Sequence, residues 1–200
     1  MRGVSRQAVE GPRDGSFPQL TVATMIDFTR NHFELFGLPA SYGVDEGALE
    51  RAYRDLQSAV HPDRFARGSD TEKRLALQSS ARVNEAYRTL RDPVARAEYL
   101  LSLRGVDAAA ETDSRLPVAF LARQLERREL ADEAIESGDV PALARLIDEI
   151  RGESAALRTD VAHALDAGDD EAARTRVREL RFLAKVGDDL EALAAAEADR

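Results

Sequence analysis

Two observations predict an all-α fold for this chain of 200 residues. From Asn31 onward the apolar side chains recur with the helical period of about 3.6, and no stretch shows the sustained two-residue alternation of a half-buried strand. Glycines, prolines and capping aspartates divide this pattern into segments of helical length. With 44% hydrophobic residues, the chain can form one ordinary domain or two small ones, each with its own core.

Residues 1–30 are predicted to be a mostly disordered lead-in. They are polar, and Gly11-Pro12 and the stretch from Gly15 to Pro18 interrupt any helical or strand period. Within them, the short run from Leu20 to Phe28 is the one part that could form a turn of helix. The first ten residues lack the apolar core of a signal peptide.

The first folded unit is predicted over residues 31–104. Asn31 can cap a short helix that Gly37 stops, and Asp45 can cap a longer one. Because a proline disfavours the helical conformation of the residue before it, this second helix should end at Val60 or His61. One face of it carries a stripe at helical spacing, which consists of Leu49, Ala52, Tyr53, Leu56 and Val60.

Two further helices complete the first unit. The third should start near Ser69 or Asp70 and run to about Leu90, and its apolar face should pack antiparallel against the stripe of the second. Asp92 and Pro93 form a cap and a first helical position, so a fourth helix should follow and end before Gly105. Residues 105–115 are small and polar, which is typical of a linker.

Residues 116–200 are predicted to form an antiparallel three-helix bundle. Three long helical patterns cover about 116–137, 141–166 and 170–198, and each of the two breaks combines a stop glycine with a capping aspartate. Connections this short favour antiparallel neighbours.

Composition narrows the possible functions. The chain has no cysteine, which excludes disulfides, thiolate metal sites and cysteine nucleophiles. No stretch approaches the roughly eighteen apolar residues of a membrane span, so we expect a soluble, cytoplasmic protein without a membrane partner. The net charge of −9 is carried by the C-terminal part, because residues 105–200 have thirteen basic and twenty-three acidic groups. Such a surface would repel nucleic acid and attract a basic protein patch, unless it is simply a solvated face.

The tripeptide His61-Pro62-Asp63 lies in the loop between the second and third helices. A catalytic or metal-binding pair is one interpretation, but the sequence has no nucleophile elbow or phosphate loop, and His32 and His163 are distant in sequence. A plain turn that connects two helices is another. A rigid loop that presents an imidazole and a carboxylate to a partner is the third.

The surrounding residues favour the third interpretation, since together with the tripeptide they resemble a J domain over about residues 31–91. The resemblance is carried by Phe33-Glu34-Leu35-Phe36-Gly37-Leu38, Tyr53, Arg64-Phe65, Asn84-Glu85-Ala86-Tyr87 and Leu90. It implies that His61, Pro62, Asp63 and Arg64, with Arg51 and Arg54 on the second helix, dock on the ATPase domain of a DnaK-type chaperone and stimulate ATP hydrolysis there.

The C-terminal part narrows the resemblance to one family. The segments that carry it are Arg96 to Leu103, Phe120-Leu121, Gln124-Leu125-Glu126 with Glu129, and Leu180-Arg181-Phe182-Leu183 with Lys185. They resemble the J-domain co-chaperones of iron–sulfur cluster assembly, the HscB family, in its bacterial type without a zinc module. The resemblance implies that the bundle binds the cluster scaffold IscU and presents it to the specialised chaperone HscA, with no cofactor and no enzymatic activity of its own.

The resemblance also implies a scaffold-binding site, which consists of Leu121, Ala122, Leu125, Glu126, Glu129, Glu133 and Phe182. The first six share one strip of a helix, where apolar side chains are followed by carboxylates. Leu121 and Leu125 could instead belong to the buried stripe of the bundle, but the acidic continuation places that edge near solvent. Relatives carry a longer apolar residue where this chain has Ala122, so about 1–2 kcal/mol of interface burial is missing if nothing compensates. A general J-domain co-chaperone with a different client remains the alternative.

Overall fold

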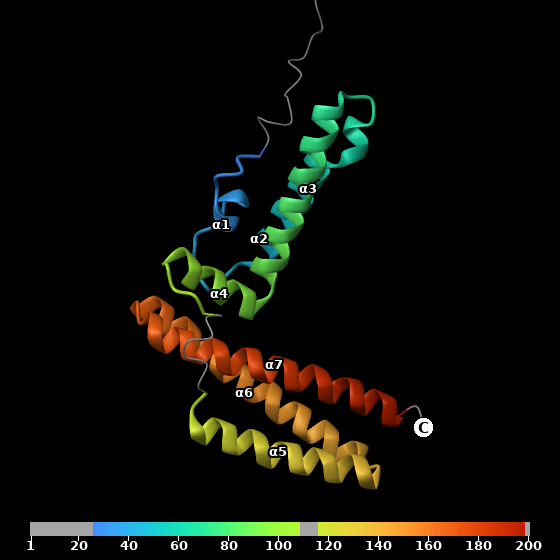
Figure 1. The fold of residues 1–200 in the computed structure, drawn as a ribbon, viewed down its shortest axis with the longest axis vertical. Helices are drawn as coiled ribbons and strands as arrows, with labels where there is room; N and C mark the ends of the chain where they lie inside the picture. The colour runs from blue at the N-terminus through green and yellow to red at the C-terminus, as the bar shows by residue number, and fades with distance from the viewer. Residues whose placement is uncertain (1–25, 109–115, 199–200) are drawn as a thin grey trace, which may run out of the picture.

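The computed structural model describes residues 26–108 and 116–198, in which helices are the only regular secondary structure (Figure 1). The N-terminal part contains α1 (His32–Leu35), α2 (Glu46–Val60), the short 3-10 helix η2 (Pro62–Phe65), α3 (Asp70–Arg91) and α4 (Pro93–Leu103). The C-terminal part contains α5 (Val118–Ser137), α6 (Val140–Ala167) and α7 (Asp170–Ala198). None of these helices is long and apolar enough to span a bilayer.

The helices begin where the capping residues predict. The Asn31 side chain accepts the Glu34 N–H at 3.0 Å, and the Glu34 carboxylate accepts the Asn31 N–H at 2.9 Å, so α1 starts with a capping box. Ser69 and Glu72 form the same arrangement at the start of α3. Asp92 accepts the Ala95 N–H at 2.7 Å and starts α4.

The helix ends also follow from the sequence. Gly138 and Gly168 adopt left-handed conformations, with φ of 66° and 73°, and close α5 and α6. Gly105 does the same just after α4, with φ of 80°. All predicted bounds of the three bundle helices lie within two residues of the observed ones, because the caps and stop residues dominate the local backbone.

The helices α2 and α3 form an antiparallel hairpin with η2 at its tip, as Figure 1 shows. Leu49 and Val60 of α2 are buried, and α3 buries Ala76, Val83 and Leu90. The predicted face of α3 is correct at these three positions. Its other buried positions are Ser79 and Ala86, whereas Ser80 and Tyr87 are half-buried and contact α2.

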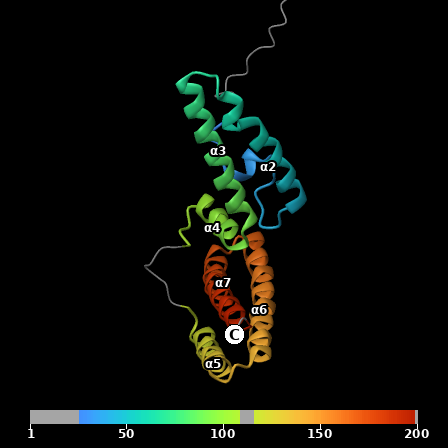
Figure 2. The same ribbon diagram turned by 90° about the vertical axis from the view of Figure 1, so that its right-hand side faces the viewer.

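The two parts of the molecule share a core, which the sequence did not predict. Val161 and Leu165 of α6 and Ala173 and Val177 of α7 belong to the same buried cluster as the core residues of α1 to α4. Figure 2 shows α4 seated on one end of α6 and α7. The bundle therefore has a core of its own and also contributes to the core of α1 to α4 at this junction.

Polar contacts reinforce the junction. Arg104, just after α4, pairs with Asp170 at 2.8 Å and donates to the Leu165 carbonyl at 3.0 Å. Arg181 of α7 donates from Nε to Glu98 of α4 at 2.7 Å. These bonds and the shared core hold the hairpin and the bundle in one arrangement.

The predicted lead-in and linker both extend less far than expected. Ile26 is buried in the first core, so the end of the predicted lead-in is packed. Ala108 is buried there as well, and Val106 packs against it, so the first residues of the predicted linker belong to the folded part. The rest of both segments, residues 1–25 and 109–115, lies outside the described residues.

Candidate functional site

The loop at the tip of the hairpin has a defined local geometry. His61 ends α2, and its Nδ1 accepts the backbone N–H of Asp63 at 3.3 Å, while Pro62 occupies the first position of η2. A neutral imidazole can accept this bond at Nδ1 and keep an N–H at Nε2 for a partner. The side chains of His61 and Asp63 are 50% and 90% exposed. The loop therefore fixes the backbone and leaves the polar groups accessible.

Three predicted arginines surround this loop and the outer face of α2. Arg51, Arg54 and Arg64 are all exposed. Arg64 donates to the Ser58 carbonyl at 3.3 Å, which ties it to the end of α2. The structure thus brings the predicted chaperone-binding residues together along one helix and its adjoining loop.

Arg54 differs from the other two because it is held by a carboxylate. It pairs with Glu50 at 2.9 Å, and Glu50 also accepts the hydroxyl of Tyr87 from α3. The hydrogen bond from Tyr87, followed by that from Arg54, lowers the pKa of Glu50. Tyr87 in turn stacks on Tyr53 with ring centroids 4.0 Å apart. This network joins α2 to α3 and partly neutralises Arg54.

The α5 face is the second candidate surface, which we define as the exposed side of that helix. Phe120, Gln124, Ala131 and Ala134 face the bundle. The predicted scaffold-binding residues of α5 lie on the other side and are all exposed, namely Leu121, Ala122, Leu125, Glu126, Glu129 and Glu133. Of the two alternatives for Leu121 and Leu125, exposure is correct, at 44% and 60%.

Val118 is a further residue of the α5 face that sequence reasoning missed. It is 83% exposed, and it precedes Ala122 and Leu125 by four and seven positions, so all three share one side of the helix. That spacing is readable in the sequence. Val118 supplies apolar area one turn before the small Ala122.

Phe182 is placed differently from the rest of the predicted scaffold site. It belongs to α7, is half-buried, and meets Phe120 edge to face with ring centroids 5.6 Å apart. It lines a groove between α5 and α7 instead of standing on the exposed face. The structure therefore brings six of the seven predicted residues onto one surface and the seventh beside it.

The two candidate surfaces lie at opposite ends of the molecule. Figure 1 shows the hairpin tip at the far end of α2 and α3 and α5 on the side of the bundle away from α4. A partner at one surface leaves the other open.

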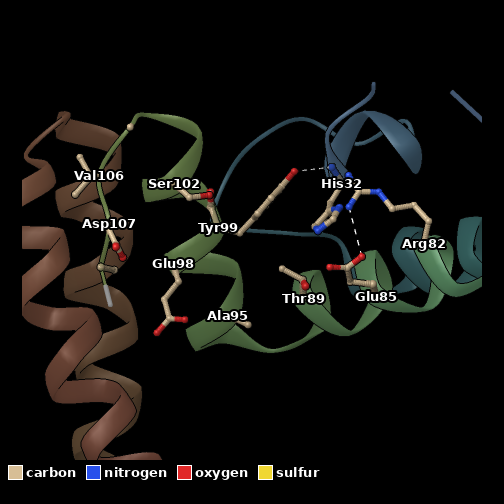
Figure 3. A pocket seen from close by; sticks show the side chains of 12 residues that line it. His32, Arg82, Glu85, Thr89, Ala95, Glu98, Tyr99, Ser102, Val106 and Asp107 are labelled. Atoms are coloured by element: carbon tan, nitrogen blue, oxygen red, sulfur yellow. Dashed lines mark hydrogen bonds and ion pairs between the residues drawn. The ribbon is translucent and has the colours of Figure 1, made fainter. Parts of the chain in front are cut away.

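A third concave region lies near the junction, between α1, α3, α4 and the residues after α4 (Figure 3). This cavity of about 660 Å³ contains none of the predicted site residues. His32, on the wall of this cavity, is buried, and its ring stacks on that of Tyr99 with centroids 4.1 Å apart. The backbone N–H of His32 donates to the Tyr99 hydroxyl at 2.9 Å. Burial first, and then the charge of Arg82, lowers the pKa of His32.

Comparisons with known proteins agree with this arrangement. Residues 31–99 match the model of the DnaJ domain, and residues 116–191 match the model of the HSCB C-terminal oligomerisation domain. The chain is 48% identical over 166 residues to a co-chaperone protein HscB homolog of Burkholderia multivorans, covering 83% of this chain and 95% of the relative. It is 52% identical over 157 residues to the homolog of Cupriavidus taiwanensis, covering 78% and 89%.

Solved structures show the same likeness over both parts. Chaperone HscB from Vibrio cholerae superposes with a TM-score of 0.76 at 33% identity, covering 84% of this chain and 99% of that one. The human co-chaperone protein HscB superposes with a TM-score of 0.79 at 30% identity, covering 90% and 91%. With a J domain whose tip carries the His-Pro-Asp loop, followed by the matching helical bundle, this chain belongs to the HscB family of J-domain co-chaperones.

Proposed function

We propose that this co-chaperone stimulates the ATPase of the DnaK-type chaperone HscA and delivers the iron–sulfur scaffold protein IscU to it. The observation that carries the proposal is the separation of two exposed surfaces on one firmly joined molecule. The hairpin tip has the polar, basic character expected for the chaperone, and the α5 face has the apolar and acidic character expected for the scaffold.

On the chaperone side, His61, Asp63 and the neighbouring arginines would make directional polar contacts. The fixed loop geometry lowers the entropy lost when such contacts form. Arg51 and Arg64 would attract an acidic groove, and Arg54 would do so after exchanging its bond to Glu50. ATP hydrolysis takes place in the chaperone, so this chain needs no catalytic residues of its own.

On the scaffold side, Val118, Leu121 and Leu125 would be buried by the partner, while Glu126, Glu129 and Glu133 would face a basic patch. Burial of apolar side chains supplies affinity, and the row of carboxylates sets orientation and speeds association. This division is supported by the exposure of the three apolar side chains, which lie outside the buried core cluster of the bundle.

The junction between α4 and the bundle holds the two surfaces on one molecule, which favours delivery of the scaffold to the chaperone. Because one molecule holds the scaffold and contacts the chaperone, the second encounter becomes intramolecular, which raises the effective concentration of the client. The shared core and the Arg104 and Arg181 contacts limit the range of distances between the two surfaces.

Purified components test the proposal. Calorimetry should show direct binding of the scaffold to this protein, and the chaperone ATPase should rise when this protein is added. A general J-domain co-chaperone with another client would stimulate the chaperone without binding the scaffold. ATP turnover by this protein without any chaperone would contradict its proposed non-enzymatic role.

A further inference from the structure

A groove between α5 and α7 adjoins the α5 face and has no part in the site described so far except for Phe182. Its volume is about 440 Å³. The apolar part of its lining comes from both helices and consists of Ala131, Ile135, Phe182, Val186, Leu190 and Leu193. Leu193 of α7 is 43% exposed, so its apolar side chain is only partly covered by the bundle. The groove is thus apolar within and open to solvent.

Gln124 lines this groove, and a hydrogen bond fixes the orientation of its side-chain amide. Gln124 is only 7% exposed, and its Oε1 accepts from Arg127 Nη1 at 3.2 Å. Arg127 is held in turn by Glu153 of α6 at 2.5 Å. Because an arginine only donates, Oε1 must face it, and the amide nitrogen must face away. That nitrogen has no hydrogen-bond partner among the described residues and is itself buried, so a carbonyl oxygen that enters the groove would satisfy it once the groove opens locally.

We propose that the groove receives a short, extended apolar segment of the same scaffold protein that docks on the α5 face, an inference that rests on the proposed function. Phe182 connects the two surfaces, since it lines the groove and packs against Phe120, the neighbour of Leu121. The scaffold would then contact the bundle on two adjoining surfaces of different character. The α5 face selects basic groups, and the groove selects apolar side chains.

The dimensions and charge of the groove fit such a segment. From Gln124 to Ile135, α5 extends for about 17 Å, which matches about five residues of extended chain. The rim carries charges of both signs. Arg128 and Lys185 are positive, and Asp132 and Asp189 are negative. A rim of this kind favours a segment of low net charge, unlike the row of carboxylates on the α5 face.

Leu193→Asp in the full chain tests the groove. It places a charge at the open end, and the affinity for purified scaffold, measured by calorimetry, should fall about tenfold. Leu77→Asp is the matched control, because Leu77 is also an exposed leucine, at 59%, but lies on α3 of the hairpin, outside both the groove and the α5 face. Gln124→Met, which removes the donor at similar volume, should weaken binding about threefold to tenfold. Thermal unfolding followed by circular dichroism verifies that each variant is folded.

The outcomes separate the groove from the proposed function. If wild-type protein does not bind the scaffold, the proposed function fails. If wild-type protein binds, Leu125→Ala weakens binding and Leu193→Asp behaves like Leu77→Asp, only the groove assignment is overturned. A change of oligomeric state for Leu193→Asp in sedimentation, with scaffold affinity unchanged, would likewise overturn it and assign the groove to a second copy of the chain.

Discussion

The hairpin tip and the α5 face are both exposed, but the chain builds them in different ways. At the tip, a proline-containing loop fixes a few polar groups through backbone bonds such as that from Asp63 to His61. On α5, an ordinary helix presents exposed apolar and acidic side chains along one side. The first surface depends on the geometry of single groups, whereas the second depends on summed area and charge. Substitutions should therefore act in an all-or-none manner at the tip and gradually on α5.

His61→Gln should produce the largest functional effect, with loss of nearly all stimulation of the chaperone ATPase. Glutamine cannot reproduce the rigid ring with an acceptor at one nitrogen and a donor at the other. Scaffold affinity and thermal stability should not change, because His61 is half exposed and outside the core. His163→Gln on α6 is the control, and it should keep full stimulation. Normal stimulation by the His61→Gln variant would show that the hairpin tip is not the surface that stimulates the chaperone.

Leu165→Ala tests the connection between the two surfaces. Leu165 is 3% exposed in the core that α6 shares with α4, so truncation should lower the free energy of unfolding by about 2–4 kcal/mol. Urea unfolding measures this loss, and Leu103→Ala, at a 45% exposed position, should cost less than about 1 kcal/mol. Equal costs for the two variants would mean that the shared core contributes little.

Leu125→Ala should weaken scaffold binding in a graded way, by about tenfold, while stimulation by the J domain alone persists. The 60% exposure of Leu125 is the area that a partner can bury. Val118→Ser should have a smaller effect, about threefold to fivefold, and Ala122→Leu should strengthen binding by a similar factor. Calorimetry measures all three. Unchanged affinity across this series would show that the α5 face is not the contact surface.

A fall in pH should destabilise the J domain through His32, with the smallest effect of the series. Burial lowers the pKa of this imidazole below 6.5, so the unfolded chain binds the proton first. Stability is thus fully present above about pH 6.5 and is lost as the pH falls toward the lower pKa of the folded state. The loss between pH 7.5 and 5.5 should shrink in His32→Phe, which keeps a ring against Tyr99, and should persist in His163→Gln.

Local signals in the sequence predicted most of the fold. Asn31, Asp45, Ser69 and Asp92 each determine a helix start through their own side chains, and two glycines close the bundle helices, so these bounds are encoded within a few residues. The His-Pro-Asp loop and the acidic strip of α5 are likewise contiguous or periodic patterns.

Contacts between distant segments were not predictable in the same way. A periodic stripe shows that a face is buried but not which element covers it, so the packing of Leu165 and Val177 under α4 was missed. The same limit applies to Ile26 and Ala108, whose burial depends on helices elsewhere in the chain. The half-buried position of Phe182 required the relative placement of α5 and α7, and the exposure of Val118 required knowing where the bundle core ends.

The most direct test of the central claim is the ATPase rate of the chaperone at a subsaturating concentration of this protein, with and without scaffold. Wild-type protein and scaffold together should stimulate more than the sum of their separate effects. Leu125→Ala should stimulate alone as wild type does and lose the added gain, and His61→Gln should show neither. Purely additive stimulation by wild-type protein and scaffold would contradict the account that one molecule presents the client and the hydrolysis signal together.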